Sequence, residues 1–314
     1  MPVYDRVGYL SEAIESILGQ SYPHFELIIV DDGSTDGSRE IIERYVVRDG
    51  RVRAIYRDEP DVTAAMNEGV RLARGDWVAR MESDDVALPD RLALTLAWAE
   101  RHGLDVCGAQ GETSGIKESY FWFPESHAAI CREMLFRCAL LHSTTIVRAA
   151  VLKENLYAAE CVFDDYELFT RLAPRYRLGN APQVLVRYRR HEAQTSVVRR
   201  EEVRRDFQKY RFRYFYAVYP QTTLAEYLPL ARVSDRGPLP TLTELEQAGG
   251  WLTRLARCAD ARVREAMAER WQRACERSAA LGDDVDAVFR RFEARMREGA
   301  EALERAGGGG DGEQ

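Results

Sequence analysis

The sequence predicts an α/β fold, in which helices cover both faces of a mostly parallel sheet and a helical extension follows. Three observations support this prediction. Residues 1–110 alternate amphipathic helical segments with short apolar strands, a pattern typical of parallel sheets. Residues 27–30 are apolar without polar alternation, as expected of a strand buried on both faces. From about residue 199 the chain becomes helical and rich in charge.

The composition indicates a globular protein and excludes several other classes. The chain has 314 residues, of which 46% are hydrophobic and 30% charged, and its net charge of −7 gives no reason to expect nucleic-acid binding. We expect no transmembrane helix and no signal peptide, because no apolar run is long enough and the amino end lacks a basic region before an apolar core. The six cysteines form no C-x-x-C pair, which favours buried thiols in a reducing compartment such as the cytoplasm.

The stretch FELIIVDDGSTDGS, residues 25–38, organises the predicted fold. Its apolar strand ends at Asp31 and Asp32, and a turn-rich loop follows. Asp36 or Ser38 can cap the next helix. The core face of that helix is expected to hold four residues: Ile41, Ile42, Tyr45 and Val46. Because ligands bind at the carboxyl ends of strands in open α/β sheets, the two aspartates are candidate ligand-binding residues.

The other predicted elements follow from local pattern. Helices are expected at residues 9–20, 62–73, 126–140 and 163–173, and a further one begins at Pro89. Strands are expected at residues 52–56, 76–81, 104–109, 143–148 and 183–188. Residues 120–123 are four consecutive aromatics. They either line a cleft in part or form a strand buried on both faces.

Two more groups of acidic residues lie at the ends of predicted elements, one after a strand and one at the start of a helix. Glu82, Asp84 and Asp85 come directly after a predicted strand, and carboxylate oxygens are ligands that Mg²⁺ and Mn²⁺ prefer. Asp164 and Asp165 open a predicted helix. A helix N-terminus stabilises a carboxylate, whereas burial beside another acid raises its pKa, which suits a general base.

Four segments together resemble family 2 glycosyltransferases, the inverting sugar transferases with a GT-A fold, a Rossmann-like α/β architecture. The segments are VDDGSTDGS, ESDDVALPDRL, VFDDYELFTRL and VRYRRHEAQTS. The resemblance spans about residues 1–197 and does not cover residues 198–314. No Q-x-x-R-W run is present, so the non-processive bacterial type is favoured. The implied activity is transfer of a sugar from a nucleotide-diphosphate sugar to a hydroxyl of a saccharide or lipid-linked acceptor, in cell-wall or polysaccharide biosynthesis.

The resemblance also implies roles for individual residues. Donor binding is assigned to Asp31, Asp32, Glu82, Arg189 and Arg190, with Glu82 standing where the family usually has Asp. A divalent cation, Mg²⁺ or Mn²⁺, is expected at Asp84 with His191. The general base is expected to be Asp165. His142 and Asp164, which stands where the family has Glu, are expected on the acceptor side.

Three other functions compete with this interpretation. A nucleotidyltransferase of related fold would favour a glycine-rich, lysine-bearing loop near the amino end, and an oxidoreductase would favour G-x-G-x-x-G; neither motif is present. A degenerate donor-binding or scaffold protein is the non-enzyme alternative, suggested by Glu82 and by the short first strand. That strand would end at residues 1–4, so we expect four to eight apolar residues upstream of Met1 in the native protein.

We expect three regions: a nucleotide-sugar-binding domain at 1–197, a helical region at 198–306 and a flexible tail at 307–314. Residues 187–216 carry ten Arg or Lys against four acids, with aromatics interleaved. One interpretation is a surface for anionic lipid or a lipid-diphosphate acceptor, and hence peripheral contact with the inner face of the membrane. The other is a solvated helix that packs on the domain through its aromatics.

Overall fold

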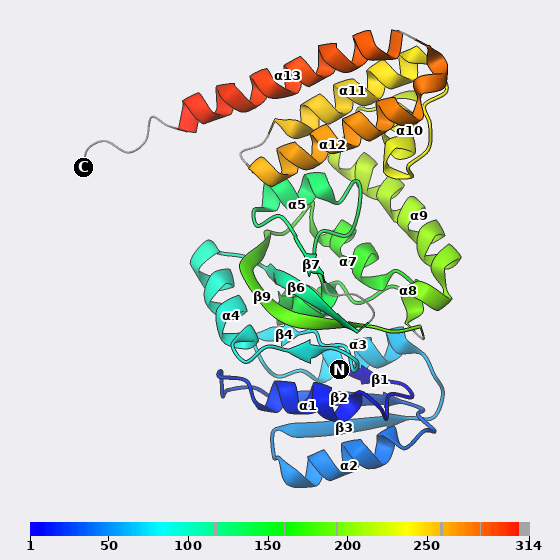
Figure 1. Cartoon of the computed structure of the whole chain (residues 1–314). Coiled ribbons are helices and arrows are strands. Elements are labelled where there is room, and N and C mark those ends of the chain that lie inside the picture. Colours follow the sequence, from blue (N-terminus) through cyan, green and yellow to red (C-terminus); the bar gives the residue numbers. More distant parts are fainter. Residues whose placement is uncertain (116–118, 160, 193, 258–259, 283, 308–314) are drawn as a thin grey trace, which may run out of the picture. The chain divides into compact units, whose positions relative to one another are not determined.

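The computed structural model describes residues 1–115, 119–159, 161–192, 194–257, 260–282 and 284–307. The chain divides into two compact units. The first comprises residues 1–130 and 138–211, and the second comprises residues 131–137 and 212–314. This division falls inside α9 (Arg200–Val218), whereas the sequence suggested that the helical region starts at 198. Figure 1 shows the elements of both units.

The first unit contains a three-stranded parallel sheet of order β1-β2-β3. Its strands are β1 (Pro2–Val3), β2 (Leu27–Asp32) and β3 (Val52–Arg57). The predicted parallel pairing is confirmed here, and β2 pairs with β3 in register from Leu27↔Val52 to Asp32↔Arg57. This register brings the end of β2, with its two aspartates, beside Arg57.

A second, mixed sheet completes the first unit, with the order β4-β8-β6-β9-β5 and with β7 paired to β6. Its strands are β4 (Trp77–Ala79), β5 (Val86–Ala87), β6 (Val106–Gly115), β7 (Tyr120–Phe121), β8 (Ile146–Arg148) and β9 (Leu178–Arg190). Only β6 and β9 pair in parallel; the other pairs are antiparallel. The long strand β9 carries its last residues to the side of the loop between β4 and β5.

Helices of the first unit follow the apolar periodicity of the sequence. They are α1 (Leu10–Leu18), α2 (Ser38–Arg48), α3 (Val62–Leu72), α4 (Arg91–His102), the start of α5 (His127–Glu133), α6 (Ala149–Glu154), α7 (Asp164–Leu172), α8 (Thr195–Val198) and the start of α9. A 3₁₀ turn, η1 (His142–Thr144), precedes β8. Leu10, Ile14, Ile29 and Ile42 are fully buried in a core shared by α1, β2 and α2.

The structure corrects two local predictions. The helix expected at 126–140 is only α5, because the backbone after it bonds in tighter i to i−3 turns, with Phe136 N–H donating to Glu133. Val46 was expected in the core of α2 but is exposed, since the buried stripe consists of Ile41, Ile42 and Tyr45. The aromatic run is split as well: Tyr120 is exposed whereas Phe123 is buried.

A cavity of about 410 Å³ adjoins the amino end of β1, and both β2 and β4 contribute to its wall. Its lining is largely apolar and includes Ile17, Leu27, Val30, Val70, Trp77 and Ile146. The Met1 ammonium donates to the carbonyl of Ile28 at 2.9 Å, and burial lowers the pKa of this amino group to about 5. Within the described part of the chain, Nε and Nη1 of the fully buried Arg91, which also lines the cavity, lack hydrogen-bond partners.

The second unit consists mainly of helices: the end of α9, α10 (Leu224–Ser234), α11 (Leu242–Ala256), α12 (Ala261–Arg277), the 3₁₀ turn η2 (Ala279–Leu281) and α13 (Asp284–Gly307). Trp271, Leu252 and Phe292 are buried there, and the Trp271 and Phe292 rings meet edge to face. Glu133 is buried and paired with both Arg137 and Arg270. Most of the tail expected at 307–314 lies outside the described residues.

The basic segment 187–216 is not one helix. It begins as the end of β9, continues through α8 and then forms most of α9. Tyr210, Tyr214 and Phe215 are buried, as expected if the aromatics pack on the protein. None of the helices in the described part of the chain is both long and apolar enough to cross a membrane.

Candidate active site

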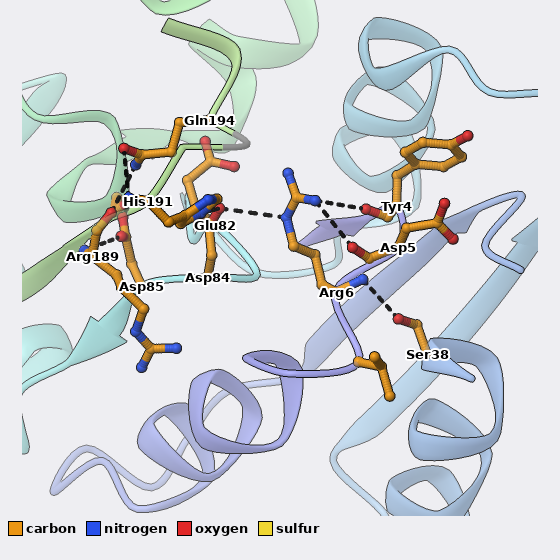
Figure 2. A network of polar contacts seen from close by, with 12 residues as sticks. Tyr4, Asp5, Arg6, Ser38, Glu82, Asp84, Asp85, Arg189, His191 and Gln194 are labelled. Carbon is orange, nitrogen blue, oxygen red and sulfur yellow. Dashed lines mark hydrogen bonds and ion pairs between the residues drawn. The ribbon is translucent and has the colours of Figure 1, made fainter. Parts of the chain in front are cut away.

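The loop after β2 fixes the backbone that follows β1. The Asp5 carboxylate accepts a hydrogen bond from Thr35 N–H at 2.8 Å, and Ser34 Oγ accepts one from Asp5 N–H. Ser38 Oγ accepts from Arg6 N–H, and the Asp36 carboxylate accepts from Val7 N–H. Asp36 also accepts from Ser38 N–H, but the N-cap of α2 is Gly37 and not the predicted Asp36 or Ser38. The loop therefore holds residues 5–7 in place, and Figure 2 shows the contact between Arg6 and Ser38.

Each aspartate at the end of β2 is paired with its own arginine. Asp31 accepts from Arg39 Nε at 2.8 Å, and Asp32 accepts from Arg57 Nε at 3.0 Å. Asp32 also accepts from the backbone N–H of Asp61. Both carboxylates are almost fully buried. Buried charges need such partners, because an unpaired one would lose its hydration without compensation.

Asp84 and His191 meet at the end of β9, although 107 residues separate them in the chain. Asp84 Oδ2 lies 3.1 Å from His191 Nε2 and 3.4 Å from Arg6 Nε (Figure 2). The Tyr9 ring stacks on His191 with a centroid distance of 5.0 Å. Gln194 closes the turn after β9, because it accepts from His191 N–H and donates to Arg189 O. The structure thus brings the two predicted cation ligands together.

The neighbouring Asp85 has a different role. It is fully buried and accepts hydrogen bonds from Ser143 Oγ and from Arg189 N–H. Burial and the negative charge of Asp84 raise the pKa of Asp85 to about 8. Asp85 therefore ties β9 and η1 to the acidic loop, and its side chain faces the protein interior.

Glu82 lies at one end of a chain of polar contacts that leads away from Asp84. Its carboxylate accepts from Arg80 at 2.7 Å and lies 3.4 Å from His142 Nδ1. His142 Nε2 in turn shares a hydrogen bond of 2.9 Å with the Tyr157 hydroxyl. Burial opposes ionisation of Glu82, but Arg80 and His142 outweigh it and hold its pKa below the usual range. The structure therefore groups Glu82 with the predicted acceptor-side His142.

Asp164 and Asp165 form the first turn of α7 and are half-buried. Burial raises the pKa of both carboxyls, and the negative charge of Glu82 adds to this effect. Arg80 opposes it at both groups, and His142 opposes it at Asp164, but burial outweighs them. Tyr166 N–H donates to Asp165, and the Cys138 thiol lies 3.8 Å from Asp165 Oδ2. Within the described residues, no lysine or arginine lies within ion-pair distance of either carboxylate. The pair holds its proton more tightly than ordinary aspartates do.

Sequence reasoning missed several residues that position this site. Asp206, on α9, accepts from the N–H groups of Val162 and Phe163 and so fixes the entry to α7. Arg80 and Tyr157 complete the Glu82 chain. Asp206 is one acid in a charged helix, and nothing local marks it as different. Its contact spans more than 40 residues, so only the folded structure reveals it.

The two predicted phosphate-binding arginines take different positions. The Arg189 guanidinium pairs with Glu12 at 2.6 Å and lies over the Tyr9 ring. Arg190 lies over the Phe121 ring, at 5.8 Å from its centroid. Arg189 shares Tyr9 with His191 as a ring contact, and its backbone N–H donates to Asp85. Asp31 and Asp32 reach this region only indirectly, through the loop that holds Arg6.

Comparisons with known proteins identify the family of the chain. The family model for glycosyl transferase family 2 matches residues 1–153. An uncharacterised glycosyltransferase of Haemophilus influenzae is 30% identical over 217 residues, which are 63% of this chain and 67% of that protein. The chain spans less than half the length of several further curated relatives.

Solved structures show the same fold at low identity. TarS 1–349 of S. aureus, in complex with UDP-GlcNAc, has a TM-score of 0.58 at 17% identity and covers 97% of this chain and 90% of its own. The mannosyltransferase PcManGT of Pyrobaculum calidifontis, in complex with GDP-Man and Mn²⁺, has a TM-score of 0.53 at 16% identity, covering 95% and 84%. The fold is thus that of GT-A glycosyltransferases, and together with the family match it shows that the chain belongs to glycosyltransferase family 2.

Proposed function

We propose that the protein is a metal-assisted, inverting glycosyltransferase that moves a sugar from a nucleotide-diphosphate sugar to an acceptor hydroxyl. The observation that carries the proposal is the Asp164–Asp165 pair, whose raised pKa suits a group that takes a proton near neutral pH. The pair lies in the electrostatic field of Glu82, which the loop after β4 places beside His142.

Asp165 is the proposed general base. The Tyr166 N–H donates to its carboxylate at the amino end of α7, where the helix favours negative charge. Asp165 takes the proton of the acceptor hydroxyl while that oxygen attacks the anomeric carbon, and the bond to the diphosphate oxygen breaks. Attack from the face opposite the leaving group inverts the configuration. Asp164, His142 and Tyr157 orient the acceptor.

Asp84 and His191 would hold the divalent cation. The two groups already converge within 3.1 Å, and the carboxylate also attracts the guanidinium of Arg6, so this position favours positive charge. No cluster of three or more ligand side chains is found in the described part of the chain. This fits Mg²⁺ or Mn²⁺, which often take one or two protein ligands and complete their shell with phosphate oxygens and water. When bound, the cation would neutralise charge on the leaving diphosphate.

Asp31, Asp32 and their loop are proposed to bind the base and ribose of the donor. Arg39 and Arg57 hold the two carboxylates in place, so the loop that begins at them keeps a fixed position. Arg189 and Arg190 are proposed to contact the diphosphate. PcManGT was solved with GDP-Man and TarS with UDP-GlcNAc, so both nucleotides are reasonable probes.

The acceptor is proposed to be a saccharide or a lipid-linked saccharide, used in cell-wall or polysaccharide synthesis at the inner face of the membrane. Arg204, Arg205 and Lys209 are exposed on α9 and could attract anionic lipid. Arg204→Glu with Arg205→Glu should weaken binding to vesicles that contain an anionic lipid. Equal binding of wild type and variant at low salt would reject the membrane contact.

Thermal unfolding with nucleoside diphosphates tests the donor proposal. UDP or GDP should raise the melting temperature in the presence of Mn²⁺, because the ligand binds only the folded state. The increase should be lost with excess chelator and in Asp84→Ala. Stabilisation of equal size with and without chelator would contradict cation-assisted binding.

A further inference from the structure

Arg6 occupies a position that neither the family resemblance nor the sequence pattern singled out. Its Nε lies 3.4 Å from Asp84 Oδ2, the same oxygen that faces His191 Nε2 (Figure 2). The Arg6 side chain is 23% exposed and that of Asp84 is 15% exposed, so water screens this contact only in part. An arginine thus sits at the carboxylate that the proposed function assigns to a divalent cation.

The backbone around Arg6 is held firmly. Asp5 adopts a left-handed conformation with φ of 48°, which is uncommon for a residue with a side chain. Arg6 Nη1 donates to the carbonyls of Tyr4 and Asp5, at 3.2 and 3.0 Å. Its own N–H is bound by Ser38, and the loop at 34–36 holds Asp5 and Val7. The guanidinium is therefore preorganised at Asp84, unlike an arginine on a free surface.

We infer that Arg6 couples binding of the cation to binding of the diphosphate. Its guanidinium pairs with Asp84 while the site is empty and with the diphosphate when both ligands bind. This inference rests on the proposed function. A cation that arrives alone must displace Arg6 from Asp84 and leave two positive charges close together, which is unfavourable. A diphosphate that arrives with it supplies oxygens for the displaced guanidinium, and arginine binds phosphate well through paired N–H donors.

Arg6 thus lowers the affinity for the cation alone more than it lowers the affinity for the cation in the presence of diphosphate. By thermodynamic linkage, the factor by which diphosphate tightens the cation equals the factor by which the cation tightens diphosphate. Removing the guanidinium should lower both factors together. A purely structural role of Arg6 would change protein stability and leave this coupling factor unchanged.

The test measures Mn²⁺ binding by electron paramagnetic resonance of the free ion, with and without saturating UDP or GDP. Arg6→Gln should bind Mn²⁺ alone more tightly than wild type does, and its coupling factor should fall by about 5-fold or more. Arg6→Lys keeps the charge and loses the paired donors, so its coupling factor should lie between those of wild type and Arg6→Gln. It replaces Arg6→Gln in the test if that variant folds poorly. Arg48→Gln is the matched control, because Arg48 pairs with Glu15 away from this carboxylate.

Two results would overturn the inference, and they differ in what else they reject. If wild type and Arg6→Gln show the same coupling between Mn²⁺ and the nucleotide, Arg6 has no such role and the proposed function stands. If wild type binds neither Mn²⁺ nor either nucleotide, the proposed donor site fails and the inference fails with it.

Discussion

The first unit contains two aspartate pairs, and their surroundings differ sharply. Asp31 and Asp32 end β2, and each is neutralised by its own arginine. Asp164 and Asp165 begin α7, and no arginine or lysine lies within ion-pair distance of them among the described residues. Burial and the charge of Glu82 raise their pKa, and the more distant Arg80 opposes this only in part. The first pair is buried at low electrostatic cost, whereas the second keeps a raised pKa.

This difference separates a pair that stabilises the fold from a pair that is suited to proton transfer. Paired carboxylates at a strand end can hold a ligand-binding loop in shape. Carboxylates without a cationic partner destabilise the folded protein when charged, and such groups are typical of catalytic sites. Changes in the two pairs should therefore act in opposite directions on stability and to different degrees on activity.

The largest effect is expected from Asp165→Asn. Loss of a general base lowers rates by about 10²–10⁴-fold, so sugar transfer should fall by roughly 10³-fold. Binding of UDP or GDP with Mn²⁺ should change little, because Asp165 acts on the acceptor. Steady-state transfer and nucleotide titrations check both points. Asp164→Asn, one residue away, is the control and should lose less activity; equal losses would show that the pair acts as one unit.

The same variant should be slightly more stable than wild type at neutral pH. A carboxyl with a raised pKa binds more protons in the folded than in the unfolded state, so its contribution to stability falls as pH rises above about 4. Replacing the carboxyl by a neutral amide removes this loss of stability, so the unfolding free energy should rise by about 1 kcal/mol. Chemical unfolding at pH 5 and pH 8 measures the difference in unfolding free energy between the variant and wild type. The increase in the variant should be larger at pH 8.

Asp32→Ala should have the opposite effect. It leaves Arg57 without its buried partner and Asp61 N–H without an acceptor, so the unfolding free energy should fall by about 1–3 kcal/mol. Asp49→Ala, which removes a surface pair with Arg51, is the control and should cost much less. If both changes cost the same, the buried pair has no special role in the fold.

Filling the cavity beside β2 should instead stabilise the same region. Four to six apolar residues added before Met1 would convert the buried ammonium into an amide and extend β1 along β2. We expect the unfolding free energy to rise by about 1–2 kcal/mol, because the added side chains bury apolar surface in the cavity. A Gly-Ser extension of equal length is the control. The same increase in unfolding free energy from both extensions would show that only removal of the Met1 ammonium charge matters.

The sequence predicted those parts of the fold that depend on local pattern. The strand–loop–helix unit around Asp31 and Asp32 follows from an apolar run and its turn residues, and β2 and α2 lie where that pattern places them. The Asp84–His191 meeting was expected only through the family resemblance. The mixed second sheet was not predicted, because pairing direction depends on chain segments that lie far apart in sequence.

The remaining parts of the site depend on long-range contacts between common residue types. Arg6 reaches Asp84 across 78 positions because the loop after β2 grips its backbone. Glu82, which stays a predicted donor-binding residue, contacts Arg80 and His142. Neither arrangement leaves a local signal, since an arginine or a glutamate in a loop is usually a solvated charge.

The titration of the Asp164–Asp165 carboxyls tests the central claim most directly. Carbon-13 NMR of protein labelled at the aspartate carboxyls, with Asp164→Asn and Asp165→Asn for assignment, follows each group against pH. We predict two coupled resonances that titrate clearly above the ~3.9 of a free aspartate. The low-pH limb of the transfer rate should follow the same titration, with activity rising as the pair loses its proton. Titration of both carboxyls at or below ~3.9 would contradict the account.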